Sequence, residues 1–187
     1  MIPAEPRFIA CRASLADARI VLFGIPFEGR VNLRRGADHG PRELRLASDS
    51  IETYSPFLGR DLEDLAIADL GDCELGDGTP REQLARAREE IRRFWRPGLR
   101  SVMLGGDHTA TLPVIEVLAP TIPDLRILQL DAHPDLREEF LGERVYLDLQ
   151  VKLAPGWRED RGLLASLDRD VDLPLGGGPA AREDDEA

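Results

Sequence analysis

Acidic residues and a histidine alternate in one short segment of the chain, LDAHPD at positions 130–135. Successive side chains of an extended backbone point to opposite sides, so we expect Asp131, His133 and Asp135 to share one side. Two carboxylates and an imidazole suit manganese or another hard to borderline divalent ion better than a metal held by thiolates. The segment therefore predicts a metal site, although a solvent-exposed turn is an alternative that it leaves open.

A second motif, GGDH at positions 105–108, follows another apolar run. Its two glycines permit a tight turn or a close approach of the backbone. His108 could then join the same metal cluster from a neighbouring strand. The glycine pair is too short for a dinucleotide-binding loop, which disfavours a nucleotide-binding domain. The third histidine, His39, is expected at the surface or in a hydrogen bond.

Both motifs come after runs that read as strands in an alternating strand and helix pattern. Short apolar runs that end at glycine, proline or aspartate predict strands at 19–24, 65–70, 100–104 and 125–130. Helices are predicted at 41–47, from Thr79 onward, and at 110–118. This alternation is typical of a parallel sheet with helices on both faces, in which ligands bind beyond the carboxyl ends of the strands.

The helix that starts near Thr79 carries the clearest signals. Thr79 can cap it, and Glu82, three residues later, can bond back to the cap. Apolar residues then recur at helical spacing and predict one buried stripe: Leu84, Ala87, Ile91, Phe94 and Trp95.

Composition excludes several classes of protein. The 187 residues include 35 acids and 24 bases, for a net charge of −11, and no basic patch of the kind that nucleic-acid binding requires. No apolar run approaches the roughly 20 residues that span a bilayer, and the N-terminal residues lack a secretory signal pattern. We therefore expect a cytoplasmic protein with no nucleic-acid or membrane partner. The two cysteines, Cys11 and Cys73, are expected to be reduced and buried.

Several segments together resemble one known family. LGGDHTATLPVI and LQLDAHPDLREEF are similar to the two N-terminal metal signatures of the ureohydrolases, the arginase and agmatinase group. FGIPFEGRVNLRRGADHGPRELRLAS resembles that family's opening strand, loop and helix, while IETYSP and IADLGD look most like agmatinase. The resemblance extends over about residues 20–144, with its motifs in the family's order.

The resemblance implies a fold, a cofactor and a reaction. The fold would be a three-layer, arginase-like α/β structure, with a mostly parallel sheet between helices and two manganese ions at the strand ends. By analogy His108 would bind one ion and His133 the other, while Asp131 would bridge the pair and Asp135 would complete the first. The substrate would be a small cationic guanidino compound, with agmatine giving putrescine and urea. The family also generally forms homo-oligomers.

The later part of the chain departs from the family. Longer members add a Ser-x-Asp-x-Asp strand, a histidine and a substrate-facing glutamate, but no histidine follows His133 here. Asp168 and Asp170 match the Ser-x-Asp-x-Asp spacing and are candidate replacement ligands, although Arg169 would lie where a buried strand requires an apolar residue. No catalytic residue is assigned.

We therefore predict two regions and hold two functional hypotheses. Residues 1–144 are expected to form a truncated ureohydrolase-like α/β domain without the family's C-terminal strands. Residues 145–187 are expected to form a divergent tail that is disordered from about residue 176. The first hypothesis is a manganese-dependent hydrolase of agmatinase type. The alternative is an inactive or frame-disrupted product, or a metal-binding remnant that acts through a partner, with one ion or none in place of two.

Overall fold

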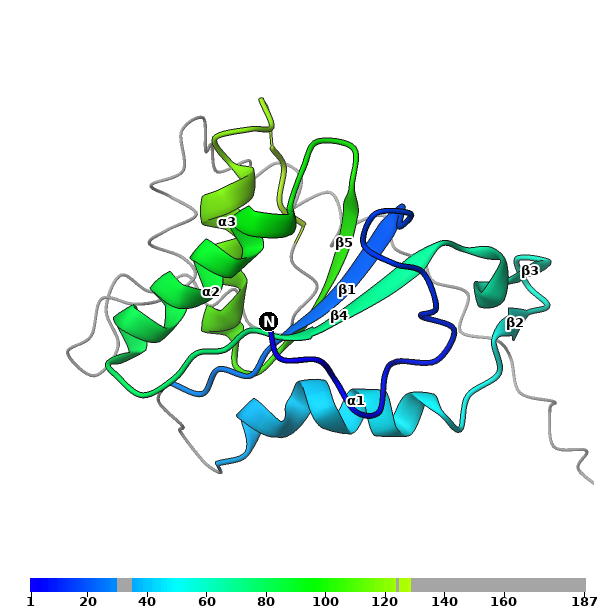
Figure 1. The fold of residues 1–187 in the computed structure, drawn as a ribbon, viewed down its shortest axis with the longest axis horizontal. Coiled ribbons are helices and arrows are strands. Elements are labelled where there is room, and N and C mark those ends of the chain that lie inside the picture. The colour runs from blue at the N-terminus through cyan, green and yellow to red at the C-terminus, as the bar shows by residue number, and fades with distance from the viewer. Residues whose placement is uncertain (30–34, 124, 129–187) are drawn as a thin grey trace, which may run out of the picture. The chain divides into compact units, whose positions relative to one another are not determined.

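The computed structural model describes residues 1–29, 35–123 and 125–128. Predictions for other residues, including the tail beyond residue 144, lie outside this description. In chain order the main elements are β1 (Ile20–Ile25), α1 (Gly40–Ser48), β4 (Ile67–Asp72), α2 (Pro80–Phe94), β5 (Arg100–Gly105) and α3 (Leu112–Leu118). A small antiparallel pair, β2 (Tyr54–Ser55) and β3 (Arg60–Asp61), lies between α1 and β4 (Figure 1).

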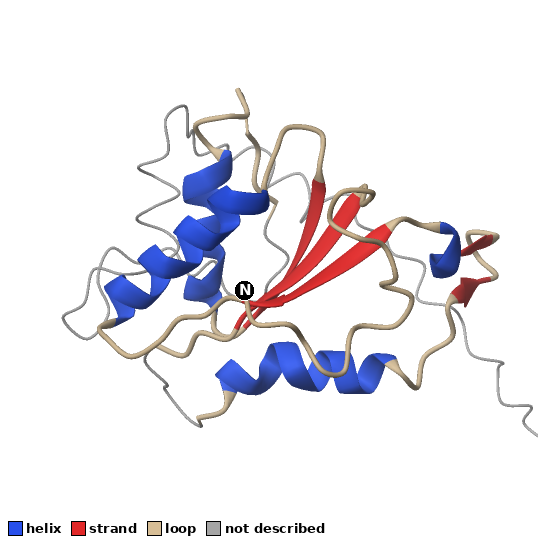
Figure 2. Cartoon of the chain, in the orientation of Figure 1, coloured by secondary structure: helices blue, strands red, loops and turns tan. Residues whose placement is uncertain are grey.

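The three longer strands form a parallel sheet in the order β4-β1-β5. In its register Val21 of β1 lies opposite Ala68 of β4 and Ser101 of β5. Helices flank both faces of these strands (Figure 2), so the prediction of a three-layer parallel α/β fold is confirmed. The strand predicted at 65–70 lies two residues later, because Leu65 instead ends a short 3-10 helix, η2 (Leu62–Asp64).

Successive side chains of β1 point to opposite faces of the sheet and contribute to two separate hydrophobic clusters. Val21, Phe23 and Ile25 point into a large core that includes residues of α2 and α3. Leu22 packs on the opposite face with Cys11 and Ile67. A central parallel strand buried on both faces accounts for the continuous apolar run in the sequence.

α2 packs on the larger core through the predicted stripe. Leu84, Ala87, Ile91 and Phe94 are buried, and the rings of Phe94 and Phe23 meet edge to face with centroids 5.1 Å apart. Trp95 is partly buried against the same core. The capping box also forms, since Thr79 accepts from the Glu82 amide and Glu82 accepts from the Thr79 amide. The sequence-based description of this helix is therefore confirmed.

α1 covers the opposite face with a charged residue at the centre of its contact. The side chain of Arg45 is 1% exposed. It pairs with Asp69, whose side chain is fully buried, and with Asp72. Arg45 Nε and Nη2 donate to the two carboxylate oxygens of Asp69 at 2.8 and 3.0 Å, and Nη1 donates to Asp72 at 2.6 Å. The carbonyl oxygens of Pro41 and Gly71 accept the remaining guanidinium N–H groups. All five donors of the buried guanidinium are thus satisfied.

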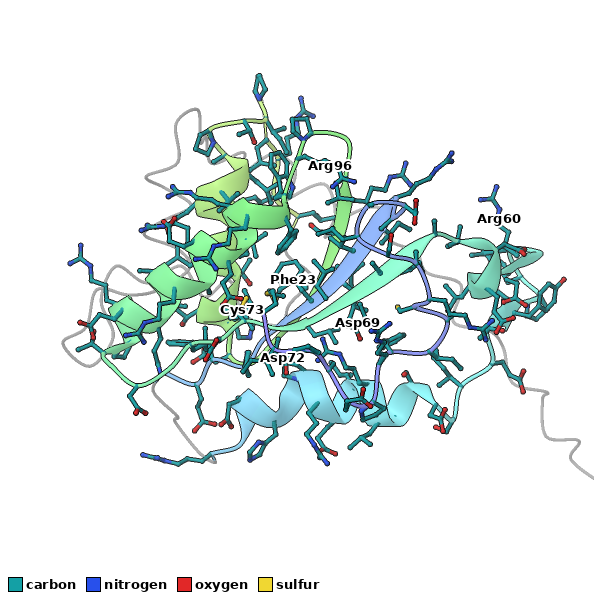
Figure 3. The ribbon with its side chains drawn as sticks, in the orientation of Figure 1. Phe23, Arg60, Asp69, Asp72, Cys73 and Arg96 are labelled. Atoms are coloured by element: carbon teal, nitrogen blue, oxygen red, sulfur yellow. The ribbon has the colours of Figure 1, made fainter. Side chains whose placement is uncertain are left out.

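Asp69 joins this ion pair to the N-terminal segment. Its carboxylate also accepts hydrogen bonds from the amides of Phe8, at 2.9 Å, and Gly71, at 3.0 Å. Burial alone would raise the pKa of Asp69, but the hydrogen bonds from Arg45 and the two amides outweigh it, and the pKa lies below its usual value. Figure 3 shows Asp69 and Asp72 between the strand β4 and α1.

One predicted strand is not formed where the structure describes it. Residues 125–128 of the predicted strand 125–130 are irregular, and Ile127 and Leu128 are 43% and 64% exposed. A β-branched apolar run forms a strand only when a neighbouring strand and a covering layer receive it. Within the described residues β5 pairs with β1 alone, so the run at 125–128 has no such neighbour there.

Both cysteines are free and buried, as the sequence predicts. Burial raises the pKa of Cys11 to about 11 and that of Cys73 to about 12, so both remain neutral thiols at pH 7. In the described ranges, no helix has both the length and the apolar composition that a membrane crossing requires.

Candidate functional site

The GGDH turn begins where β5 ends. The Gly106 amide donates to the Ile25 carbonyl at 3.0 Å, and the Asp107 amide donates to the Phe27 carbonyl at 3.0 Å. A Cβ atom on Gly106 would lie 1.9 Å from the Phe27 carbonyl oxygen, so no other residue fits this position without moving the backbone. The turn after β5 is therefore held against the segment that follows β1.

His108 follows this turn as the first residue of a short 3-10 helix, η3 (His108–Thr111), which leads into α3. Asp107 caps η3, because its Oδ1 accepts from the Thr109 amide at 2.9 Å. Its other oxygen, Oδ2, accepts from the Gly29 amide at 2.8 Å. His108 thus lies at the carboxyl edge of the sheet, where a parallel α/β fold presents its ligands.

The described ends of the loop between β1 and α1 lie at the same edge. Glu28 Oε2 accepts from the amides of Gly36, at 2.5 Å, and Ala37, at 2.8 Å, which joins the two ends of the loop. At the start of α1, a Cβ on Gly40 would lie 2.9 Å from the Gly105 carbonyl oxygen, so the helix directly abuts the end of β5. His39 is exposed beside Asp38 and takes no part in this packing, as predicted.

The described residues contain one of the predicted metal ligands. His108 is at the sheet edge, whereas Asp131, His133 and Asp135 lie outside the described residues, as do Asp168 and Asp170. Across residues 1–29, 35–123 and 125–128, no three His, Cys, Asp or Glu side chains are grouped closely enough to hold an ion. The predicted set of two imidazoles and two carboxylates would fit manganese in its chemistry, because both ligand types bind ions of this hardness.

Asp107, Gly29 and Glu28 were not singled out by the sequence reasoning. Part of the signal was available, since aspartate is a preferred N-cap residue and Asp107 makes the local bond of such a cap. The bond to Gly29 joins residues 78 positions apart and has no local signature. Only the pairing of β1 with β5 brings these two loops together.

The segment that forms this edge of the sheet is similar to one known protein family. The sequence profile described as the arginase family matches residues 18–147, which include both the GGDH and the LDAHPD segments. An agmatinase of Bacillus subtilis is 38% identical over 136 residues, covering 73% of this chain and 47% of the relative. The N(1)-aminopropylagmatine ureohydrolase of Thermococcus kodakarensis is 35% identical over 125 residues, covering 66% of this chain and 42% of the relative.

Solved structures agree with the sequence relatives. The agmatine ureohydrolase of Thermoplasma volcanium superposes with a TM-score of 0.66 at 26% identity, covering 82% of this chain and 51% of that structure. The chain therefore spans about half the length of the relatives that it matches. The segment that matches the family profile includes all three strands of the sheet and the turn that carries His108.

Proposed function

We propose that this chain, which belongs to the arginase family, catalyses the manganese-dependent hydrolysis of a guanidino compound. The observation that carries the proposal is the position of His108, directly after the carboxyl end of β5 and inside the segment that matches the family. The LDAHPD segment in the same match supplies the other expected donors.

Four side chains would hold the metal: His108, Asp131, His133 and Asp135. When bound, paired divalent ions supply Lewis acidity, which lowers the pKa of water toward neutrality. The two carboxylates would offset part of the metal charge, and the two imidazoles would bind as neutral donors. In the overall reaction one water adds to the guanidinium carbon and the bond from that carbon to the alkyl-bearing nitrogen breaks, giving urea and an amine.

We propose agmatine, or an agmatine extended at one nitrogen, as the substrate. The relatives described above are an agmatinase, an aminopropylagmatine ureohydrolase and an agmatine ureohydrolase, which supports this choice over an amino acid substrate. The products would be urea together with putrescine or a longer polyamine. The acidic balance of the chain, −11 at pH 7, favours the approach of such a cation.

The histidines of the chain provide an internal control for the test. Purified protein would be stripped with chelator, reloaded with manganese, and assayed for urea release from agmatine. We expect His108→Ala and His133→Ala to abolish release and His39→Ala, at an exposed position, to leave it unchanged. Zinc and magnesium reloading would test the preference for manganese.

Two results would contradict the proposal. One is urea release from the loaded wild-type chain no greater than that of His108→Ala. The other is equal release with and without manganese.

We further propose that the protein is cytoplasmic. Its only two cysteines are buried as free thiols, which is the usual state in a reducing compartment. Fractionation of cells that express the tagged chain would test this, and recovery in the periplasm or the medium would contradict it.

A further inference from the structure

The carboxylate of Asp107 is bonded to two separate segments at once. Its Oδ1 accepts from the Thr109 amide at 2.9 Å, within its own turn. Its Oδ2 accepts from the Gly29 amide at 2.8 Å, in the loop that follows β1. Each oxygen of the Asp107 carboxylate therefore already accepts from an amide.

The loop that receives Asp107 is itself firmly anchored. Phe27 is almost fully buried in the large core, and its carbonyl accepts from the Asp107 amide at 3.0 Å. A Cβ on Gly29 would come within 3.1 Å of the Phe27 ring, so the chain from 27 to 29 is closely packed. Asp107 is thus tied, through both its backbone and its side chain, to a fixed part of the core.

His108 lies between two residues, Asp107 and Thr109, whose backbone or side-chain groups are hydrogen-bonded. The residue before it is bonded to Phe27 and Gly29, and the amide of the residue after it is bonded to Asp107. Its backbone therefore has little freedom to rotate. Some hydrogen bonds orient a metal ligand without coming from a ligand themselves. Loss of such bonds typically lowers metal affinity by about 10- to 100-fold.

We infer that Asp107 is a positioning residue for His108, which joins the loop after β1 to the turn after β5 and does not itself bind the metal. The inference rests on the proposed function for its consequence in metal binding. Its structural content is independent of that function.

The first test needs no metal. Imidazole resonances of His39, His108 and His133 would be assigned with His-to-Gln variants and compared between the wild-type chain and Asp107→Ala. We expect the His108 resonances to shift or broaden, the His39 resonances to stay, and the amides of Gly29 and Thr109 to exchange faster. Unchanged His108 resonances, or unchanged exchange at Gly29, would overturn the inference.

Asp61→Ala is the matched control. Asp61 accepts from the amide two residues later, Glu63, at 3.0 Å, which is the same local bond that Asp107 makes to Thr109. Removing it should leave the His108 resonances and the metal affinity unchanged. Asp107→Asn is the milder variant if Asp107→Ala fails to fold. It retains one acceptor oxygen, so we expect one of the two amides to stay protected and His108 to shift less.

The second test measures manganese affinity by electron paramagnetic resonance of the free ion. We expect Asp107→Ala to bind manganese 10- to 100-fold more weakly than the wild-type chain, and Asp61→Ala to bind it equally. Equal affinity in Asp107→Ala and wild type would overturn the inference while leaving the proposed function intact. If the wild-type chain binds no manganese, the proposed function fails, and the resonances of His108 alone decide the inference.

Discussion

The helices on the two faces of the sheet pack through different kinds of interaction. α2 lies on its face through an apolar stripe, with Ile91 and Phe94 packed against Phe23 of β1. α1 lies on the other face through Arg45, Pro41 and Ser48, while its Leu44 and Leu46 are exposed. One helix is thus attached by hydrophobic burial and the other by an ion pair at its centre.

Mutation should therefore destabilise the two helix contacts by different mechanisms. An apolar contact loses free energy in proportion to the atoms removed and the cavity left behind. A buried ion pair loses more when one partner is removed, because the other charge is then left buried without its partner and without water. The charged face should therefore be the more sensitive to a single change, although it buries less apolar surface.

The largest expected effect is at Arg45. Arg45→Met removes the partner of the fully buried Asp69 and should lower the free energy of unfolding by about 3–5 kcal/mol, measured by urea denaturation. Arg42→Met is the control, since Arg42 is exposed on the same helix and, among the described residues, pairs with its neighbour Glu43. We expect it to change stability by less than about 0.5 kcal/mol. Equal losses in the two variants would show that the buried pair has no special importance.

A somewhat smaller loss is expected on the apolar face. Ile91→Ala should cost about 2–4 kcal/mol, through lost burial and a residual cavity, in the same denaturation assay. Ile51→Ala, at an exposed isoleucine beyond α1, should cost much less. Arg45 and Ile91 share no partner, so their losses should add in the double variant to within about 0.5 kcal/mol. A clear departure from additivity would mean that the two faces are coupled through the sheet.

Acid should destabilise the charged face of the sheet more than the apolar one. The pKa of Asp69 is lowered in the folded state, so its contribution is complete above the unfolded value, near 3.8, and is lost as pH falls through the folded value. Denaturation curves from pH 7 to pH 2.5 should show this loss in the wild-type chain and in Ile91→Ala. Arg45→Met should have a flatter profile, because its Asp69 lacks the guanidinium. Parallel profiles in all three proteins would contradict the assignment.

The smallest expected effect lies at the start of α2. Thr79→Ala removes the acceptor of the capping box and should cost about 1 kcal/mol, measured by thermal or urea unfolding. Thr79→Ser retains the hydroxyl and should cost only a few tenths. A loss in Thr79→Ser as large as that in Thr79→Ala would mean that the methyl group, and not the hydroxyl, stabilises the helix.

The elements that the sequence predicted well are those with local signals. The cap at Thr79, the stripe through Ile91 and the apolar run of β1 each depend on residues within a few turns of one another. The exception, the run at 125–128, has strand-forming residues but no neighbouring strand within the described residues. Strand formation depends on a partner, which the residues of the strand itself do not specify.

The candidate site also has some features with a local sequence signal and others that depend on distant residues. His108 was found from its motif, and its place at the carboxyl end of β5 followed from the strand before it. The roles of the carboxylates could not be told apart by residue type alone. Asp107 bonds to an amide 78 residues away and Asp69 pairs with an arginine on α1, although both are ordinary acids near strand ends in the sequence.

The sequence alone identified the family and the alternation of strands and helices, because both depend on residues that are close together in the chain. It also predicts the metal donor set. Only the tertiary structure decided that Arg45 faces the sheet while Leu44 faces outward, and that Asp107 reaches the loop after β1. Those choices depend on which distant groups the sheet brings within hydrogen-bonding distance, and a buried charge is stable only where such groups are already in place.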